Sequence, residues 1–460
     1  MTSRIEKTLL VKNIDIAVTM NEQREEIKNA ALFCRGGVIE YVGTMDSLPA
    51  ATKQADEIIN LSGHVLIPGL INTHHHMYQT LTRAIPAAQD SELFGWLKAL
   101  YPIWAGLQPE MIRVSTQMAM SELMLSGCTT SSDHLYIYPN GCRLDDSIEA
   151  AQEIGMRFHA TRGSMSVGES KGGLPPDRVV EKEDDILFDT RRLIETWHDA
   201  KRHAMTRVAV APCSPFSVSR DLMRESAVLA RSYKVNMHTH LAENIHDIAY
   251  SQEKFNCTPA QYAEDLGWTG ADVWHAHCVQ LDAHGIAMFA KSGTGVAHCP
   301  CSNMRLASGI APIRTMLDAG VKVGLGVDGS ASNDKGHMLG EARQAMLLQR
   351  VGFGQVALNA RQALELATRG GASVLGRDDI GYLAPGMSAD FVAFRLDDME
   401  MAGGLADPVA SLIFCTPSKV NWSVINGRPV IREGNLSTIE LTLLITRHNR
   451  LAKELLNSAR

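Results

Sequence analysis

Three consecutive histidines, His74, His75 and His76, end the stretch VLIPGLINTHHH at residues 65–76. Side chains alternate between the two faces of a β-strand, so a strand here would place His74 and His76 together and His75 on the opposite face. Two imidazoles on one face could share a metal ion. Because an isolated pair of this kind is also common at a polar strand end, the rest of the chain must decide between a metal site and a structural role.

Further residues that could bind a metal or move protons stand at the ends of other expected strands. The stretch HTHLAEN contains His238, His240 and Glu243, HAHCV contains His277, and GVDG contains Asp328. Three imidazoles and a carboxylate form a suitable ligand set for a divalent ion such as zinc or iron. We favour His240 over His238 as the third histidine ligand. Glu243 follows His240 by three residues and could reach the same pocket from the next loop.

The elements that must position these residues alternate between short apolar runs and amphipathic helical stretches, which indicates βαβ units and a parallel sheet. Eight such units in about 280 residues fit a (β/α)8 barrel, in which the carboxyl ends of all strands meet at one mouth. An open, doubly wound sheet is the alternative, although the sequence has neither a GxGxxG motif after the first strand nor a Walker loop. We expect strands at 65–76, 128–135, 156–163, 207–215, 235–241, 272–279, 294–302 and 321–329. We expect helices at 110–126, 143–155, 183–199, 219–232, 258–266, 282–291, 310–319 and 338–350.

Both ends of the chain have a different pattern, with short alternating β-rich segments at 1–67 and 381–440. Asn426-Gly427 lies between two of these segments, and this dipeptide is a strong signal for a hairpin turn. We therefore predict an α/β protein in which a TIM-like barrel at 68–380 carries a small composite β-sandwich domain built from both termini. Residues 441–460 are expected to form a final amphipathic helix.

The composition is that of an ordinary globular protein, with 460 residues, 45% of them hydrophobic, and a net charge of −7. No basic run supports nucleic-acid binding, and no apolar segment is long enough to span a bilayer. The first residues lack the apolar centre of a signal peptide. The nine scattered cysteines favour reduced thiols. We expect a cytoplasmic protein with no nucleic-acid or membrane partner.

The motifs NTHHH, HTHLAEN, HAHCV and GVDGSASND, in this order, resemble the amidohydrolase superfamily and its cytosine/guanine-deaminase-like branch. The resemblance covers essentially the whole chain. It implies that His74, His76, His240 and Asp328 bind metal. It also implies one divalent ion per chain, zinc before iron, because the lysine that bridges two metals in other branches has no counterpart in VAVAPCSPFS.

The same resemblance implies catalytic roles for three residues. Asp328 would take a proton from water and later deliver it to the leaving group, and Glu243 would protonate a ring nitrogen. His277 would donate a hydrogen bond to the attacking oxygen. Triazine chlorohydrolases resemble this chain but carry threonine in the stretch that contains Asp328, so the carboxylate favours loss of an amine. A barrel that only retains metal is disfavoured, because it would need neither Glu243 nor His277.

Three stretches, SMSVGESKGGLPPDRVVE, APCSPFSVSRDLMRESA and HCPCSNMRLASGIAPIR, resemble bacterial 8-oxoguanine deaminases most closely and are near to hydroxyatrazine ethylaminohydrolases. Cys213 stands where guanine deaminases usually carry arginine, which disfavours plain guanine. Gln79 and Arg83 could bind a purine's carbonyl and ring N–H groups, or could simply begin a surface helix. We expect a small nucleobase-like substrate, 8-oxoguanine before isocytosine, in a homo-oligomer. The alternatives are an amine, alkylamine or chloride leaving a triazine, and deamination of guanine or cytosine.

Overall fold

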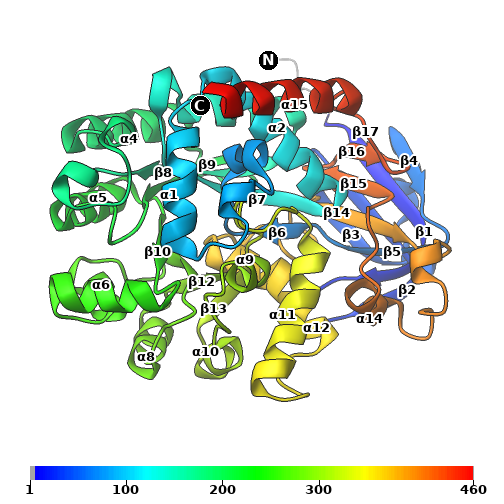
Figure 1. Ribbon diagram of the computed structural model, residues 1–460. Coiled ribbons are helices and arrows are strands. Elements are labelled where there is room, and N and C mark those ends of the chain that lie inside the picture. Colours follow the sequence, from blue (N-terminus) through cyan, green and yellow to red (C-terminus); the bar gives the residue numbers. More distant parts are fainter. Residues whose placement is uncertain (1–5, 459–460) are drawn as a thin grey trace.

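The computed structural model describes residues 6–458 and contains a closed barrel of eight parallel strands beside a separate nine-stranded sheet (Figure 1). The barrel order is β10-β11-β12-β13-β6-β7-β8-β9, so each strand pairs with its neighbour in sequence and β13 closes against β6. The predicted fold class is therefore confirmed. The barrel strands are β6 (Leu70–Asn72), β7 (Cys128–Leu135), β8 (Arg157–Ser164), β9 (Thr206–Pro212), β10 (Met237–Leu241), β11 (Val273–His277), β12 (Gly295–His298) and β13 (Lys322–Leu325).

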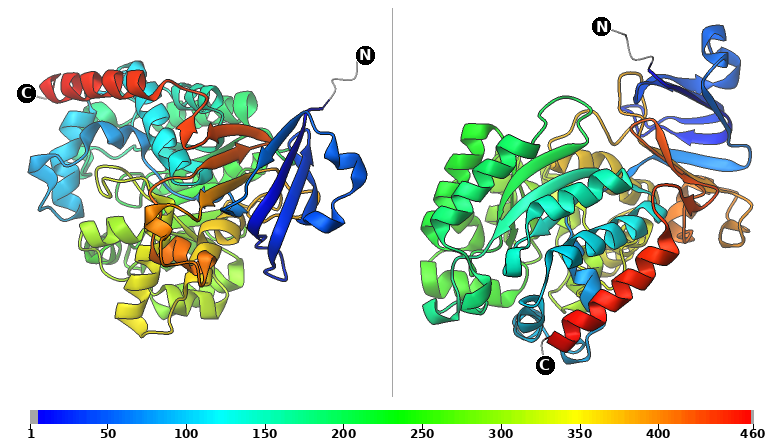
Figure 2. Two further views of the ribbon diagram at one scale, coloured as in Figure 1. Left: turned by 90° about the vertical axis from the view of Figure 1, so that its right-hand side faces the viewer. Right: turned by 90° about the horizontal axis from the view of Figure 1, so that it is seen from above.

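Helices surround the barrel, and all eight expected helices between the strands are present (Figure 2). Six further helices, α1, α6, α9, α12, α13 and α14, occupy stretches for which the sequence predicted none, and α9 begins within the stretch 294–302 that was expected to be a strand. The helices are α1 (Leu93–Trp104), α2 (Pro109–Leu125), α3 (Leu144–Ile154), α4 (Glu183–Trp197), α5 (Arg220–Tyr233), α6 (Ile245–Phe255), α7 (Pro259–Asp265), α8 (Ala283–Ser292), α9 (Pro300–Arg305), α10 (Ile313–Ala319), α11 (Met338–Phe353), α12 (Ala360–Glu365), α13 (Gly371–Val374), α14 (Pro408–Phe414) and α15 (Leu441–Ser458).

Helix α1 forms where it does because of a capping residue and an apolar stripe. The Glu92 side chain accepts hydrogen bonds from the backbone N–H groups of Phe94 and Gly95 at the helix start. Six buried residues then recur at helical spacing, so one face of α1 is apolar. They are Leu93, Trp96, Leu97, Leu100, Tyr101 and Trp104. This apolar face packs toward the barrel mouth, so α1 lies over the carboxyl ends of the barrel strands.

The nine-stranded sheet combines strands from both ends of the chain, as predicted, because β14 pairs antiparallel with β5 (Figure 2). The hairpin signal is also confirmed: β15 and β16 pair across Asn426 and Gly427, which have φ values of 50° and 73°. Two central residues with positive φ define the turn that suits a twisted hairpin. The strands of this sheet are β1 (Thr8–Val18), β2 (Glu26–Arg35), β3 (Val38–Thr44), β4 (Glu57–Asn60), β5 (His64–Pro68), β14 (Phe391–Arg395), β15 (Trp422–Ile425), β16 (Arg428–Arg432) and β17 (Asn435–Leu436).

The stretch VLIPGLINTHHH is not the single strand that the sequence predicted. The chain leaves the terminal sheet after β5, changes direction at Gly69 and enters the barrel as β6. A Cβ atom at Gly69 would lie 1.9 Å from Thr129 Oγ1, so the barrel wall leaves no space for a side chain there. The three histidines follow β6 in an irregular segment. The prediction of one strand that continues through His76 is therefore wrong, although the His74 and His76 rings do meet, with centroids 4.7 Å apart.

A buried ion pair joins the barrel to the terminal sheet. Arg157, at the start of β8, makes a bidentate contact with Asp390, just before β14, with N–O distances of 2.7 and 3.0 Å. Asp390 also accepts a hydrogen bond from the backbone N–H of Asn426. Both charged side chains are almost completely buried. The pair links the terminal sheet to the amino-terminal end of β8.

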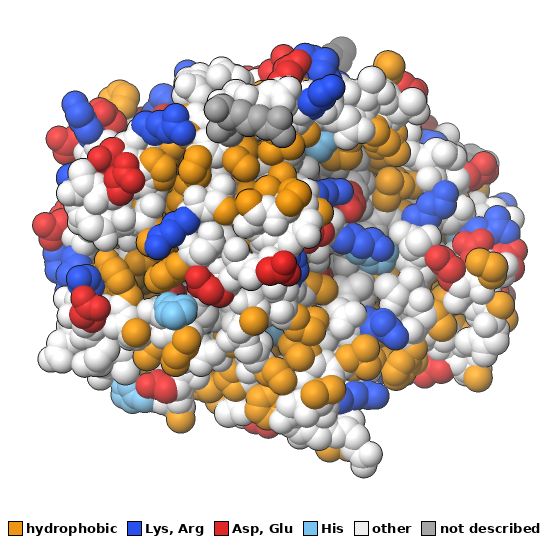
Figure 3. All heavy atoms as spheres, in the orientation of Figure 1, with side chains coloured by type: hydrophobic (Ala, Val, Ile, Leu, Met, Phe, Trp, Pro, Cys, Tyr) orange, Lys and Arg blue, Asp and Glu red, His pale blue; other side chains and the backbone are white. Residues whose placement is uncertain are grey.

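The surface carries both signs of charge side by side on the face seen in Figure 3. Many charged groups on the surface of the protein form ion pairs, as Arg361 does with Glu26 and Asp407. Exposed pairs of this kind contribute little to stability. Among residues 6–458, no helix combines the length and the apolar character needed to cross a membrane.

Candidate active site

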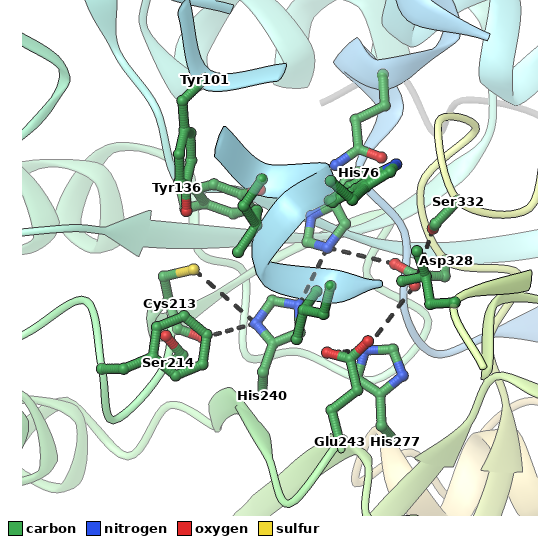
Figure 4. A pocket seen from close by; sticks show the side chains of 16 residues that line it. His76, Tyr101, Tyr136, Cys213, Ser214, His240, Glu243, His277, Asp328 and Ser332 are labelled. Carbon is green, nitrogen blue, oxygen red and sulfur yellow. Dashed lines mark hydrogen bonds and ion pairs between the residues drawn. The ribbon is translucent and has the colours of Figure 1, made fainter. Parts of the chain in front are cut away.

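A cavity lies at the barrel mouth, where the carboxyl ends of the strands meet. His76, His240, Glu243, His277 and Asp328 all line it, although they come from four different strand ends. Figure 4 shows these side chains converging on one point. The structure thus brings together the residues that the sequence singled out.

The candidate metal ligands lie within contact distance of one another. His74 Nε2 and His76 Nε2 are 3.2 and 3.4 Å from the same oxygen, Asp328 Oδ1. His76 Nε2 lies 3.1 Å from His240 Nε2. All four side chains are buried. Three imidazole nitrogens and one carboxylate oxygen therefore surround a common point.

In His76 and in His240, the hydrogen bond made by Nδ1 determines which ring nitrogen keeps an unshared lone pair. His76 Nδ1 donates to the His134 carbonyl oxygen at 2.7 Å, and His240 Nδ1 donates to the Cys213 carbonyl oxygen at 2.6 Å. A carbonyl oxygen only accepts, so each Nδ1 carries the hydrogen and each Nε2 of the neutral ring presents a lone pair. Burial lowers the pKa of both rings, that of His240 to about 3, which keeps them neutral.

His74 is oriented in the same way through a second histidine. His238 Nδ1 donates to the Trp274 carbonyl oxygen at 3.0 Å, so His238 Nε2 must be the acceptor for the Nδ1–H of His74 at 2.8 Å. His74 Nε2 then faces the cluster, and it has no hydrogen-bond partner within residues 6–458. As expected from the sequence, His238 is a neighbour that orients His74. Such partners raise the basicity of a ligand and fix its angle.

The arrangement fits a bound cation. Two neutral rings that point lone pairs at each other across 3.1 Å repel unless a positive charge stands between them. The donor set of imidazole nitrogen and carboxylate oxygen is the one that zinc accepts. Possible ligand atoms of His74, His76, His134 and His240 lie within 4.8 Å of one another, and so do those of His74, His277 and Asp328. Because Asp328 Oδ1 is also 3.2 and 3.4 Å from the Nε2 atoms of His74 and His76, the expected set of His74, His76, His240 and Asp328 fits a divalent ion.

The possible acid–base groups stand beside this cluster. His277 Nε2 lies 3.5 Å from Glu243 Oε2 and 3.8 Å from Asp328 Oδ2, while its Nδ1 donates to Asn303 Oδ1 at 2.9 Å. Burial raises the pKa of the Glu243 carboxyl well above its usual range, and the nearby Asp247 and Asp328 carboxylates raise it further. Glu243 is thus suited to carry a proton that it can donate.

Two of these residues have strained backbones. His277 has φ of 71° and Asp328 has φ of 62°, in the left-handed region that non-glycine residues seldom adopt. Such conformations cost free energy and collect at functional sites. Asp328 is also held by hydroxyl groups, since the side chains of Ser302 and Ser332 donate to its Oδ2.

Of the three residues expected to bind the substrate, two line the cavity and one does not. Gln79 lines the cavity, and its Nε2 has no hydrogen-bond partner among the described residues. Cys213 also lines the cavity. Arg83 does not line it, because its guanidinium pairs with Glu122 on α2 instead.

Other side chains at the cavity were not anticipated from the sequence. Tyr101 and Trp96 reach it from α1, Tyr136 from the segment after β7, and Ser332 from the loop after β13. The indole N–H of Trp96 donates to the Ala331 carbonyl oxygen at 3.0 Å, which ties α1 to the loop that carries Asp328. The sequence did offer a signal for Tyr136, because the stretch LYIYP places two tyrosines at the end of an expected strand.

A closed parallel barrel with imidazole and carboxyl groups gathered at the mouth defines a metal-dependent barrel hydrolase. The sequence matches the Amidohydrolase family over residues 65–430. The chain belongs to this family, and within it to the metal-dependent deaminases that hydrolyse C–N bonds of cyclic amidines.

Several known proteins are similar over nearly the whole chain. An 8-oxoguanine deaminase from Pseudomonas aeruginosa is 43% identical over 92% of this chain and 93% of its own length. A hydroxydechloroatrazine ethylaminohydrolase from Pseudomonas sp. strain ADP is 38% identical over 86% of this chain and 84% of its own. Among solved structures, the atrazine chlorohydrolase from Arthrobacter aurescens complexed with zinc has a TM-score of 0.92 and 33% identity, covering 96% of this chain and all of that one.

Proposed function

We propose that this protein deaminates 8-oxoguanine hydrolytically to urate and ammonia. The observation that carries the proposal is that a single cavity is lined both by the two carboxyl groups expected of a deaminase and by uncharged polar groups that could bind the substrate. Glu243 and Asp328 lie on its catalytic side, whereas Gln79 and Cys213 present neutral donors. The 43% identity to an 8-oxoguanine deaminase supports the same substrate.

In this proposal His74, His76, His240 and Asp328 hold one divalent ion, with zinc preferred because imidazole and carboxylate suit it. The zinc complex of a chlorohydrolase with the same fold supports that preference. When bound, the ion supplies Lewis acidity that lowers the pKa of water from its bulk value toward neutrality.

The residues of the chain itself then move the protons. Asp328 accepts a proton from the attacking water and later delivers it to the departing amine. Glu243 donates its proton to the ring nitrogen beside the amino-bearing carbon, which makes that carbon electrophilic. His277 keeps its Nε2 toward the reacting oxygen and, when both ring nitrogens carry a hydrogen, donates to that oxygen as negative charge develops there. Loss of ammonia from the tetrahedral carbon gives urate.

The second candidate is release of an alkylamine from a hydroxytriazine. The 38% identity to an ethylaminohydrolase favours it. Leucine side chains at the cavity, among them Leu93, Leu97 and Leu306, also offer an apolar surface for an N-alkyl group. The catalytic residues would keep their roles, so only substrate preference separates the two candidates.

A comparison of substrates tests the proposal. Amine release should be measured from 8-oxoguanine, guanine, isocytosine, cytosine and an N-ethyl hydroxytriazine with the zinc-loaded protein. We expect kcat/KM to be highest for 8-oxoguanine and lower for guanine by roughly 10²–10⁴-fold, because polar groups that bind the extra carbonyl are left unpaired by guanine. A ratio near one, or a preference for the hydroxytriazine, would contradict the assignment.

A further inference from the structure

Glu341, in the first turn of α11, is a buried carboxyl group that takes no part in the mechanism proposed above. It is 2% exposed, and burial raises its pKa to about 7. Taking a carboxyl group out of water costs free energy unless hydrogen bonds replace those that water made. Both of its oxygens accept hydrogen bonds, and the two donors come from two different segments of the barrel mouth.

The first donor is Asn333, in the loop that follows β13. Its side-chain amide donates to Glu341 Oε1 and, at 2.7 Å, to the Val327 carbonyl oxygen. The backbone N–H of Asn333 donates to the Gly329 carbonyl oxygen at 3.0 Å. Val327 and Gly329 are the chain neighbours of Asp328, so Asn333 holds the backbone on both sides of that residue.

The second donor is the backbone N–H of Cys301, which lies 3.3 Å from Glu341 Oε2. Cys301 belongs to the first turn of α9, where backbone N–H groups have no partner within the helix. Helices α9 and α11 lie side by side (Figure 1). Glu341 therefore ties the start of α9 to α11, and α9 carries Ser302 and Asn303 directly after Cys301.

Both segments that Glu341 holds lead to the expected acid–base side chains. The Ser302 hydroxyl donates to Asp328 Oδ2, and Asn303 Oδ1 lies 2.9 Å from His277 Nδ1. Asp328 and His277 have the strained backbones described above, which persist only where surrounding contacts hold them. One carboxyl group outside the cavity thus supports the loop of Asp328 and the helix that supplies partners to both residues.

We propose that Glu341 is a positioning residue that aligns Asp328 and His277 for the reaction, which rests on the roles that the proposed function gives them. Glu341 does not line the cavity, so it acts only through the segments of Asn333 and Cys301. A misplacement of about 1 Å at reacting groups can cost roughly 10²-fold in rate. Substrate binding should suffer less, because the substrate-facing groups proposed above lie on other elements.

The test uses Glu341→Gln, which keeps the shape of the side chain. Glutamine has an NH2 group in place of one oxygen, so either the Asn333 amide or the Cys301 N–H must face another donor. In the zinc-loaded protein we expect kcat for 8-oxoguanine to fall by roughly 10–100-fold while KM changes less than about threefold. An unchanged kcat would overturn the proposal, and so would a loss of kcat/KM that lies entirely in KM.

Gln349→Met is the matched control on the same helix. Gln349 is completely buried, and its side chain accepts from the Arg314 backbone N–H and donates to the Ala311 carbonyl oxygen. Both contacts are to the segment around the start of α10 rather than to α9 or to the loop after β13. The control should lower the melting temperature but keep kcat within about threefold. Equal losses of kcat in the two variants would show that Glu341 contributes only stability.

Metal binding gives a readout that does not depend on turnover. Because Asp328 is an expected ligand, Glu341→Gln should weaken zinc binding by roughly 10-fold in competition with a chromogenic chelator. The visible absorption bands of the cobalt-substituted protein respond to ligand geometry and should shift in the same variant. Gln349→Met should change neither property. A zinc affinity and a cobalt spectrum equal to those of the wild type in Glu341→Gln would overturn the proposal.

Asn333→Ala tests the path of the effect from its other end. If Glu341 acts through Asn333, the double variant should lose less kcat than the product of the two single losses. Fully multiplicative losses would mean that the two residues act independently and would overturn the proposal. If circular dichroism shows that Glu341→Gln does not fold, Asn333→Ala alone provides the test, with the same expected fall in kcat and the same limit on KM.

The failure of the positioning role and the failure of the proposed function give different results. Wild-type turnover of 8-oxoguanine that Glu341→Gln leaves unchanged would overturn the positioning role alone. Wild-type protein that leaves 8-oxoguanine untouched would overturn the proposed function. The role of Glu341 would then be decided by zinc affinity, by the cobalt spectrum and by kcat for whichever compound of the substrate comparison releases an amine.

Discussion

His76 Nε2 and His240 Nε2 lie 3.1 Å apart, and each ring has already given its only neutral-state hydrogen to a backbone carbonyl oxygen. Neither nitrogen can donate to the other, so the contact becomes favourable only with a cation between them. The fold therefore prepares a metal site before the metal arrives.

The protein should contain one tightly bound divalent ion per chain. The Nε2 atoms of His74 and His76 lie close to Asp328 Oδ1, and His76 Nε2 lies close to His240 Nε2. The stretch VAVAPCSPFS around the end of β9 contains no lysine that could bridge a second ion. Elemental analysis of the purified protein should give close to one equivalent, and a strong chelator should abolish turnover until zinc is restored. Two equivalents, both required for turnover, would rule out a mononuclear site.

His238→Phe should weaken zinc binding by roughly 10–100-fold, because His74 would lose the acceptor that fixes its ring. Phenylalanine keeps the stacking of residue 238 on Trp274, whose ring centroid is 4.5 Å away. Competition with a chromogenic chelator measures the affinity. His275→Phe is the control, since His275 is buried on the adjacent strand against Phe289 and should affect zinc little. Equal effects of the two variants would show that His238 has only a packing role.

Glu243→Gln should keep the metal and lose roughly 10²–10⁴-fold in kcat, because glutamine cannot deliver a proton to the substrate ring. Glu243 lies 3.5 Å from His277 Nε2, on the edge of the ligand cluster. Metal content and steady-state rates should be measured on the same preparation. Parallel loss of zinc and turnover would show instead that Glu243 belongs to the ligand set.

Asp390→Ala should lower the free energy of unfolding by about 3–5 kcal/mol, because it leaves the Arg157 guanidinium buried without its partner. Denaturant titration followed by circular dichroism measures the change. Glu57→Ala breaks the exposed pair between Arg432 and Glu57 and should cost at most about 1 kcal/mol. Similar losses for both variants would mean that the buried pair does not tie the sheet to the barrel.

His448 on α15 should make stability depend on pH. Its Nε2 contacts Thr80 Oγ1 at 2.9 Å in η3 (Met77–Thr82), and burial, aided by the positive charge of Arg83, lowers its pKa from 6.5 to about 4. Between about pH 6.5 and 4 the unfolded chain binds a proton at His448 and the folded chain does not. The free energy of unfolding is therefore greatest above about pH 6.5 and decreases as the pH falls toward 4.

The corresponding variant is His448→Gln, which removes the titrating group. Between pH 7.5 and 5 the wild-type protein should lose about 2 kcal/mol more unfolding free energy than the variant. Denaturant midpoints at the two pH values supply the comparison. Identical pH dependence of the two proteins would show that His448 titrates normally in the folded state.

Local sequence determined much of this protein. The alternation of apolar runs and amphipathic helices indicates the barrel, because each strand and each helix must bury its apolar face against a core. Asn426-Gly427 specifies its hairpin through two positive φ values that these residues tolerate. Closure of the barrel brings the carboxyl ends of all its strands to one mouth, so titratable residues at the ends of expected strands come together there. The structure brings His76, His240 and Asp328 together in this way.

Only the tertiary structure decided the rest, because it depends on contacts between residues distant in sequence. Gly69 stands where the chain passes from one sheet to the other, and only glycine fits there because Thr129 occupies the space that a Cβ atom would need. Arg83 turns away from the cavity because Glu122 of α2 offers a closer charge, a pairing that no local pattern encodes. Tyr101 reaches the cavity because the apolar face of α1 packs over the barrel mouth. Local periodicity sets which face of an element is buried, but the neighbour that covers that face is fixed only when the whole chain packs.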